Sequence, residues 1–261
     1  MFEHSAPAIR PLPAGPHERR FTPSHRCDEG EHAMAATALP SSGAVPPAKL
    51  CDASGMAEIH RLFTHGFGEG PALVGGVAEG DRDHAAAVAG QLELLSVSLH
   101  AHHGGEDERL WDMLSTRSPA CGPHVARMKA QHARMLEHLA ELDAALPAWR
   151  ASGTAADAAT VRAALDGVNA ALAEHLPDEE RTIVPVMEQV ITEKEVAWFG
   201  EHGRKSTPKG QTWNMLGAIM RGQPDGGDEW MRKNLPGPVR LLWRAVGSRR
   251  YAKTRAALEG R

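Results

Sequence analysis

Two stretches of the sequence carry a histidine followed four residues later by a glutamate: His102 with Glu106, and His175 with Glu179. Each pair continues a ladder of apolar residues spaced alternately three and four apart. The apolar members are Leu92, Leu95 and Leu99 in the first stretch and Val161, Leu165, Val168 and Leu172 in the second. A helix in a bundle buries positions at this spacing, so both pairs are predicted to point into a core.

Two further histidines occupy the same kind of position. His60 lies between Met56 and Phe63, and His132 lies between Met128 and Met135, again at spacings of three and four. His103 is one residue past His102 and is predicted to lie on the surface. Other histidines that miss the ladders are assigned to the surface with it: His65, His84, His100, His124 and His138.

Breaks near Gly80, Pro119 and Gly153 divide the middle of the chain into four helical stretches. Asp81, Ser118 and Thr154 are the candidate N-caps. With no strand pattern and short connections, the expected fold is all-α, an antiparallel up-down four-helix bundle over residues 53–190. Residues 1–52, rich in Pro, Ala and Ser, are predicted to be a disordered tail, and residues 191–261 a helical C-terminal extension.

Antiparallel helices of this length bring the four ladder histidines and two glutamates to one level of the bundle. Burying an unpaired carboxylate costs on the order of several kcal/mol of folding free energy. Two buried His–Glu pairs could satisfy one another, but metal ions neutralise the carboxylates and also use the imidazole lone pairs. Two bridging carboxylates imply two metals, and nitrogen and oxygen donors without thiolate suit iron, manganese or zinc. The predicted metal ligands are His60, His102, Glu106, His132, His175 and Glu179.

The turn that joins each histidine to its glutamate contains helix-disrupting residues. Gly104 and Gly105 follow His102, and Pro177 follows His175. If these turns kink, Asp107 or Glu180 could replace the preceding glutamate as a ligand. Both acids lie one residue off the ladders, so Glu106 and Glu179 are preferred.

The C-terminal extension begins with a capping-box pattern, Thr192–Glu195, that predicts a short helix. Further short helices are expected over 211–221 and 238–258. The last 33 residues contain nine Arg and Lys against two Glu. Either Leu242 and Trp243 dock on the bundle and leave the arginines solvated, or the basic end contacts a partner.

Composition narrows the remaining classes. The 261 residues carry a net charge of −4, which favours neither nucleic acid nor an anionic membrane as a partner of the whole chain. Cys27, Cys51 and Cys121 show no CxxC spacing, and neither a secretion signal nor a membrane span is recognisable. The expected location is therefore the cytoplasm. The oligomeric state is not predicted.

The sequence resembles the hemerythrin-like (HHE cation-binding) family. The matching segments contain the six predicted ligands in order, and they are "IHRLF", "HHGGEDERLW", "QHARM" and "HLPDEERTIVP". The resemblance covers about residues 53–190 and implies two non-haem iron ions, oxo- or hydroxo-bridged, as the cofactor. The segment "LPGPVRLLWRAVGSRRYAKTR" also looks like a C-terminal extension found in some members.

Oxygen carriers of this family use five histidines, with a HisxxxHis pair on the third helix. This chain has Met128 and Leu136 four residues either side of His132. Six protein ligands would leave open metal positions, so the resemblance favours a protein that binds or reacts with O₂, NO or hydrogen peroxide. It allows a di-iron oxidoreductase with catalase-like activity. An iron- or redox-sensing regulator acting through the C-terminal region and a structural zinc bundle are the alternatives.

Overall fold

The computed structural model describes residues 48–261. Across this range the chain is helical and contains no strand, which confirms the all-α class. Most of the predicted tail, with Cys27, lies outside the described residues. The last part of that tail is not disordered: Leu50 N–H donates to Glu188 O at 2.7 Å, and Cys51 is buried. The domain boundaries at residues 52 and 190 stay a prediction.

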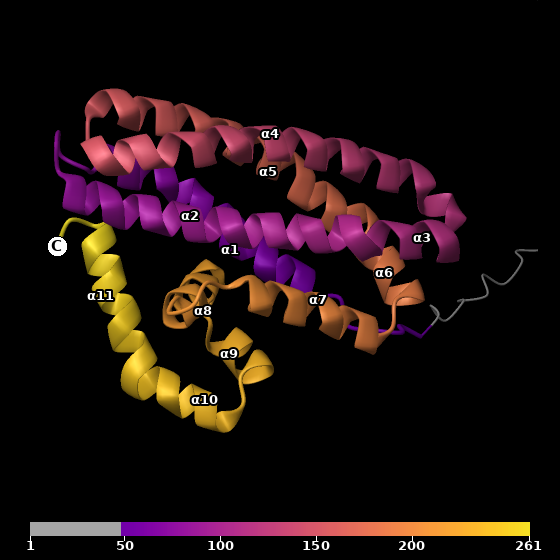
Figure 1. The fold of residues 1–261 in the computed structure, drawn as a ribbon. Helices are drawn as coiled ribbons and strands as arrows, with labels where there is room; N and C mark the ends of the chain where they lie inside the picture. The colour runs from indigo at the N-terminus through magenta and orange to yellow at the C-terminus, as the bar shows by residue number, and fades with distance from the viewer. Residues whose placement is uncertain (1–47) are drawn as a thin grey trace, which may run out of the picture. The chain divides into compact units, whose positions relative to one another are not determined.

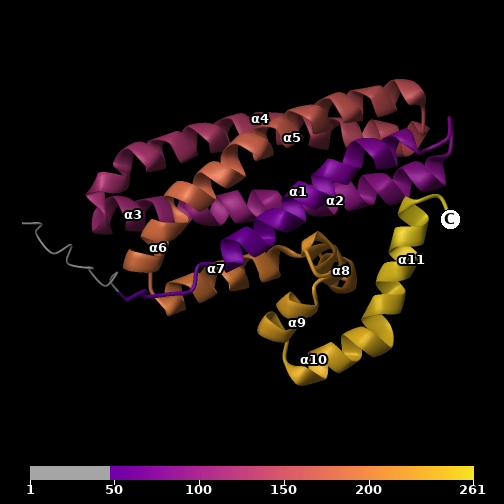
Figure 2. The ribbon, with the colours of Figure 1, turned by 180° about the vertical axis from the view of Figure 1, so that it is seen from behind.

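Four long helices lie alongside one another (Figures 1 and 2). They are α1 (Gly55–Gly75), α2 (Arg82–Gly105), α4 (Gly122–Ser152) and α5 (Ala155–Thr182). Helix α1 packs on α2 and α5, and α4 also packs on both of these helices. Each long helix therefore has two long neighbours, and the four enclose a common interior.

Side-chain caps explain where two of these helices, α2 and α5, begin. The Asp81 side chain accepts from His84 N–H, and the Thr154 side chain accepts from Asp157 N–H, which confirms two predicted N-caps. Gly153, between α4 and α5, has φ +64°, a left-handed conformation that favours glycine. The third predicted cap is wrong, because Ser118 makes no side-chain capping bond and is followed by the 3₁₀ turn Pro119–Cys121.

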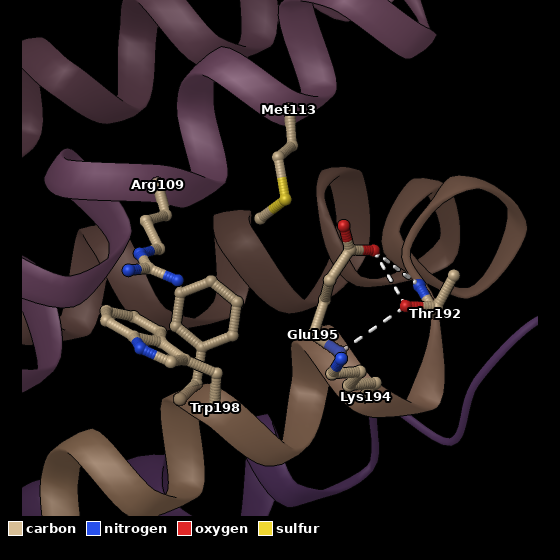
Figure 3. A pocket seen from close by; sticks show the side chains of 7 residues that line it. Arg109, Met113, Thr192, Lys194, Glu195 and Trp198 are labelled. Carbon is tan, nitrogen blue, oxygen red and sulfur yellow. Dashed lines mark hydrogen bonds between the residues drawn. The ribbon is translucent and has the colours of Figure 1, made fainter.

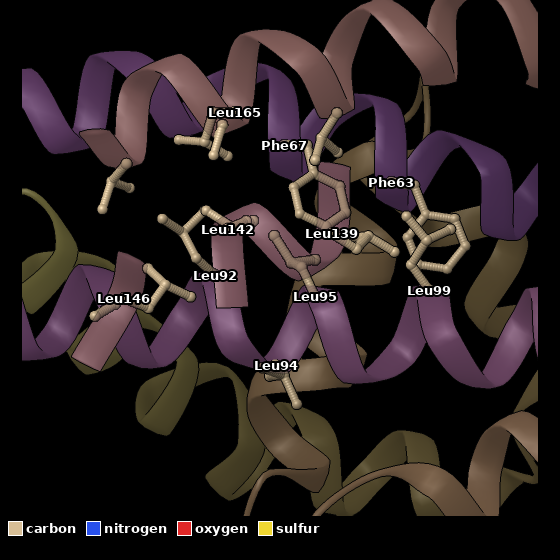
Figure 4. Packing of buried hydrophobic residues seen from close by; sticks show 14 of the residues in the cluster. Phe63, Phe67, Leu92, Leu94, Leu95, Leu99, Leu139, Leu142, Leu146 and Leu165 are labelled. Carbon is tan, nitrogen blue, oxygen red and sulfur yellow. The ribbon is translucent and has the colours of Figure 1, made fainter. Parts of the chain in front are cut away.

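Leucine and phenylalanine side chains fill the space between the long helices (Figure 4). Phe63 and Phe67 of α1 meet the α2 ladder, and every one of the predicted α2 and α5 ladder leucines is buried. This packing holds the helix faces that carry the histidines toward one another. The labelled side chains in this space are Phe63, Phe67, Leu92, Leu95, Leu99, Leu139, Leu142, Leu146 and Leu165, while Leu94 points away from them toward the C-terminal helices.

The two His–Glu turns differ in the helix that follows them. Glu106 N–H still donates to His102 O, and a π-helix, Glu106–Leu110, follows and continues as α3 (Trp111–Arg117), so the bulge lies after the turn that contains the two glycines. Helix α5 continues through Pro177 to Thr182, and α6 (Val184–Val190) follows. Both His–Glu turns are therefore α-helical, and only the first is followed by a π-helix.

Short helices form the C-terminal region. They are α7 (Glu193–Ser206), α8 (Thr212–Gly222), α9 (Asp228–Asn234), α10 (Gly237–Leu242) and α11 (Ser248–Leu258), with a π-helix, Trp243–Gly247, between the last two. The capping box predicted at Thr192 and Glu195 is present. Helix α7 packs on α2, α8 on α1, and α11 on α2 and α8. None of the helices in residues 48–261 has the length and apolar character needed to cross a membrane.

Candidate metal site

Buried histidines and glutamates meet in two clusters inside the four long helices. One cluster contains His60, His102 and Glu179, and the other contains His103, Glu106, His132 and His175. Within each cluster the candidate ligand atoms all lie within 4.8 Å of one another. The structure thus brings together all six residues selected from the sequence, and adds a seventh. Their role as metal ligands remains a prediction.

The assignment of His103 to the surface is wrong. His103 is 1% exposed, and its ring stacks on that of His132 with centroids 4.1 Å apart. The side chain of His102, its neighbour, is 12% exposed. Helix α2 therefore supplies two imidazoles, one to each cluster.

The prediction failed because the buried face of α2 is wider than a single ladder of positions spaced three and four residues apart. On a helix with about 3.6 residues per turn, Glu106 falls between His102 and His103 in angle, and the three span about 100°. A helix in a globular core buries a stripe at least about that wide. The signal was present, because Leu95, Leu99 and His103 are spaced by four residues each.

Each buried glutamate lies close to both clusters. Glu106 places Oε1 3.4 Å from His102 Nε2 and Oε2 3.5 Å from His132 Nε2. Glu179 Oε2 is 3.3 Å from His60 Nε2 and 3.5 Å from His175 Nε2. A carboxylate in this position has the reach to bridge two metal ions.

The two alternative acids face the outer ring nitrogens instead. Glu180 Oε1 is 2.8 Å from His60 Nδ1, and Asp107 Oδ1 is 2.9 Å from His132 Nδ1. Both side chains are 40% exposed. Asp107 also accepts from Trp111 Nε1–H at 2.6 Å. These acids therefore position the histidines and lie outside the two clusters.

The third outer partner is an amide rather than an acid. Gln131 donates from Nε2 toward Asp178, so its Oε1 accepts from His175 Nδ1–H at 3.0 Å. Asp178 is held in turn by two bonds from Arg127, of 2.6 and 3.0 Å. This chain of contacts was not predicted from the sequence, because polar and charged residues spaced four apart are ordinary on the surface of a helix.

These outer bonds decide which way the ring lone pairs point. A carboxylate or amide oxygen only accepts, so His60, His132 and His175 carry the proton on Nδ1 and turn a bare Nε2 inward. The Nε2 atoms of His132 and His175 are 3.2 Å apart, as are those of His60 and His102. Facing lone pairs at this distance repel one another unless a proton or metal ion lies between them.

The inner polar atoms lack hydrogen-bond partners among the described residues. Both side-chain oxygens of Glu106, both of Glu179 and both ring nitrogens of His103 are buried without one. Burial and the neighbouring His132 hold the pKa of His103 well below its usual range, and burial beside Glu179 raises that of Glu106. Burial lowers the pKa of His175 to about 4. Burial thus disfavours charge on these three groups, and a bound cation would offset the cost of an ionised Glu106.

Helix α7 covers the π-helical turn from outside. A Cβ added at Gly105 would lie 3.3 Å from His202 and 3.7 Å from Phe199, so glycine permits this close approach. Beside it is a surface pocket of about 390 Å³ between the π-helix and α7 (Figure 3). Arg109 lies over the Trp198 ring there, 3.9 Å from its centroid. The turn that carries Glu106 thus packs against α7 at both Gly105 and Arg109.

The helical architecture and the buried donor set define a helical protein with a candidate two-metal centre. The model of the hemerythrin HHE cation binding domain matches residues 55–187, and the chain belongs to this family. The hemerythrin-like domain implies metal binding, typically of iron. No curated protein and no solved structure matches the chain.

Proposed function

We propose that residues 53–190 form an up-down four-helix bundle that holds two non-haem iron ions, bridged by Glu106 and Glu179. His60 and His102 bind one iron, and His103, His132 and His175 bind the other. The observation that carries the proposal is that the carboxylate oxygens of Glu106 and Glu179 and both ring nitrogens of His103 are buried without hydrogen-bond partners among the described residues. Iron bound here supplies redox chemistry and a binding position for small molecules.

The proposed activity is binding of, or reaction with, O₂, NO or hydrogen peroxide, in the handling of oxidative or nitrosative stress. The cluster of His60 and His102 offers two imidazoles, while the other cluster offers three. A small ligand therefore has most room beside His60 and His102. With His103 included, the number of candidate metal ligands no longer argues against reversible O₂ binding. The experiment must therefore distinguish carriage of O₂ from reaction with it.

The test is a metal count and a visible spectrum of the protein purified in air. The expected result is about two irons per chain, with the charge-transfer absorption of a bridged pair. Cycling of that absorption by peroxide with O₂ release supports a catalase-like role, and stable spectral change under NO or O₂ supports binding. A colourless protein that holds zinc contradicts the proposal.

An iron- or redox-responsive regulator is the second candidate. It is favoured by the contact of Phe199 and His202 with Gly105, since a shift of the ligand turn would be transmitted to α7. Oxidised and reduced protein should then differ in hydrogen exchange over residues 193–206, while peroxide leaves the spectrum unchanged. Equal exchange in both states rules out this route.

A further inference from the structure

The C-terminal π-helix and the helices on either side of it have two clearly different faces. Trp243, Gly247 and Tyr251 face the rest of the protein: a Cβ added at Gly247 would lie 2.6 Å from Trp213, and Trp243 packs near Tyr251. The opposite side is exposed at paired positions four and three residues apart. These are Leu241 and Leu242, Ala245 and Val246, Arg249 and Arg250, and Ala252 and Lys253.

The exposed stripe is apolar at its start and basic at its end. Leu241 is 67% exposed, Leu242 49% and Val246 37%. These are three of the six large hydrophobic side chains exposed in residues 48–261, gathered within six positions. Isolated exposed apolar residues are ordinary on soluble proteins, but a contiguous group marks a contact surface. The prediction that Leu242 docks on the bundle is therefore wrong.

The charge of this segment is one-sided. Residues 230–258 contain eight Arg and Lys and no Asp or Glu, in a chain whose net charge is −4. Lys233 and Arg255 form ion pairs with acids of α1. Within the described part of the chain, Arg244, Arg249, Arg250 and Lys253 form none.

We infer that the surface formed by Leu241, Leu242, Val246, Arg249, Arg250 and Lys253 binds the face of an anionic phospholipid bilayer. The aliphatic side chains enter the headgroup boundary, and the cations lie over lipid phosphates. Nucleic acid would use the cations but leave the leucines in water. Figures 1 and 2 show α10 as an outlying element, away from α4 and α5, with α11 running at an angle to it.

The test uses the full chain with its metal and sucrose-loaded vesicles of phosphatidylcholine, with or without about 30 mol% phosphatidylglycerol. The protein should sediment with the anionic vesicles only, and less as salt is raised. Arg249→Glu with Arg250→Glu should lower the partition coefficient at least about tenfold. Leu241→Ser with Leu242→Ser should lower it by a similar factor, about tenfold.

A matched control changes the same net charge elsewhere. Arg82→Glu with Arg162→Glu alters two exposed arginines on α2 and α5, and binding should persist. Circular dichroism and metal content establish that each variant is folded. The proposal is overturned if the wild type ignores anionic vesicles or if the control loses as much binding. It is also overturned if the leucine variant binds like wild type, which would indicate a purely electrostatic surface such as one for nucleic acid.

Discussion

Two neighbouring histidines of α2 differ from a third nearby in what they face. His102 and His103 lie in the clusters, whereas His100 is 38% exposed and lies 3.1 Å from Asp143 Oδ2 on the surface. Both ring nitrogens of His103 are buried without a hydrogen-bond partner among the described residues, a cost that a hydrophobic side chain at this position would not carry. The proposed metal binding would give an imidazole at this position a role.

His103→Ala should therefore lower the iron content of the purified protein by half or more, because the cluster with three imidazoles loses one. His100→Ala, three residues earlier, should retain full occupancy. Iron per chain by elemental analysis is the measurement. Equal iron in both variants would show that His103 is only a buried neighbour of the site.

At the scale of elements, an N-cap and a π-helix fix where α2 begins and ends, and so where along the helix axis its two clustered histidines lie. Asp81 begins α2 with a bond to His84 N–H, and the π-helix begins at Glu106 after the two glycines. Helix α2 therefore has a defined start and a defined interruption. Between these two points, the buried face of α2 brings His102 and His103 beside the clustered histidines of the neighbouring helices.

Asp81→Ala should destabilise the protein by about 1 kcal/mol through loss of the N-cap bond, and Asp81→Asn should restore most of it. Ser118→Ala provides the matched control, since Ser118 makes no capping bond and little change is expected. Chemical unfolding followed by circular dichroism gives the free energies. A Ser118→Ala loss as large as that of Asp81→Ala would contradict the assignment of the caps.

At the scale of the whole molecule, the C-terminal helices share the core of the long helices. Met215 and Ala218 of α8 and Leu258 of α11 belong to the same buried cluster as Phe63. His84 Nε2–H donates to Leu258 O, with 2.9 Å between the atoms, which fastens the end of α11 to α2. The exposed stripe thus lies on a C-terminal region that is packed against the long helices.

Gly217→Ala should loosen the packing of α11 on α8, because the added Cβ would lie 2.2 Å from Tyr251 Cγ and α11 must move away. The expected result is faster amide exchange in residues 248–258 and a loss of about 1–3 kcal/mol. Gly90→Ala, where nothing lies within 4 Å, should instead stabilise α2 by about 0.5–1 kcal/mol. Unchanged protection of α11 in Gly217→Ala would contradict this packing.

The amino-acid sequence by itself determined the helices, two of their three predicted N-caps and six members of the buried clusters. It could do so because periodicity and capping are local: a ladder spaced three and four apart has one buried side whatever it packs against. Only the tertiary structure decided how wide that side is, and so placed His103 inside. It also decided that Asp107 and Glu180 face the outer nitrogens, and that α7 and α11 dock on α2. These contacts join residues that are 25 to 174 positions apart in the chain, and no local pattern encodes which of them meet.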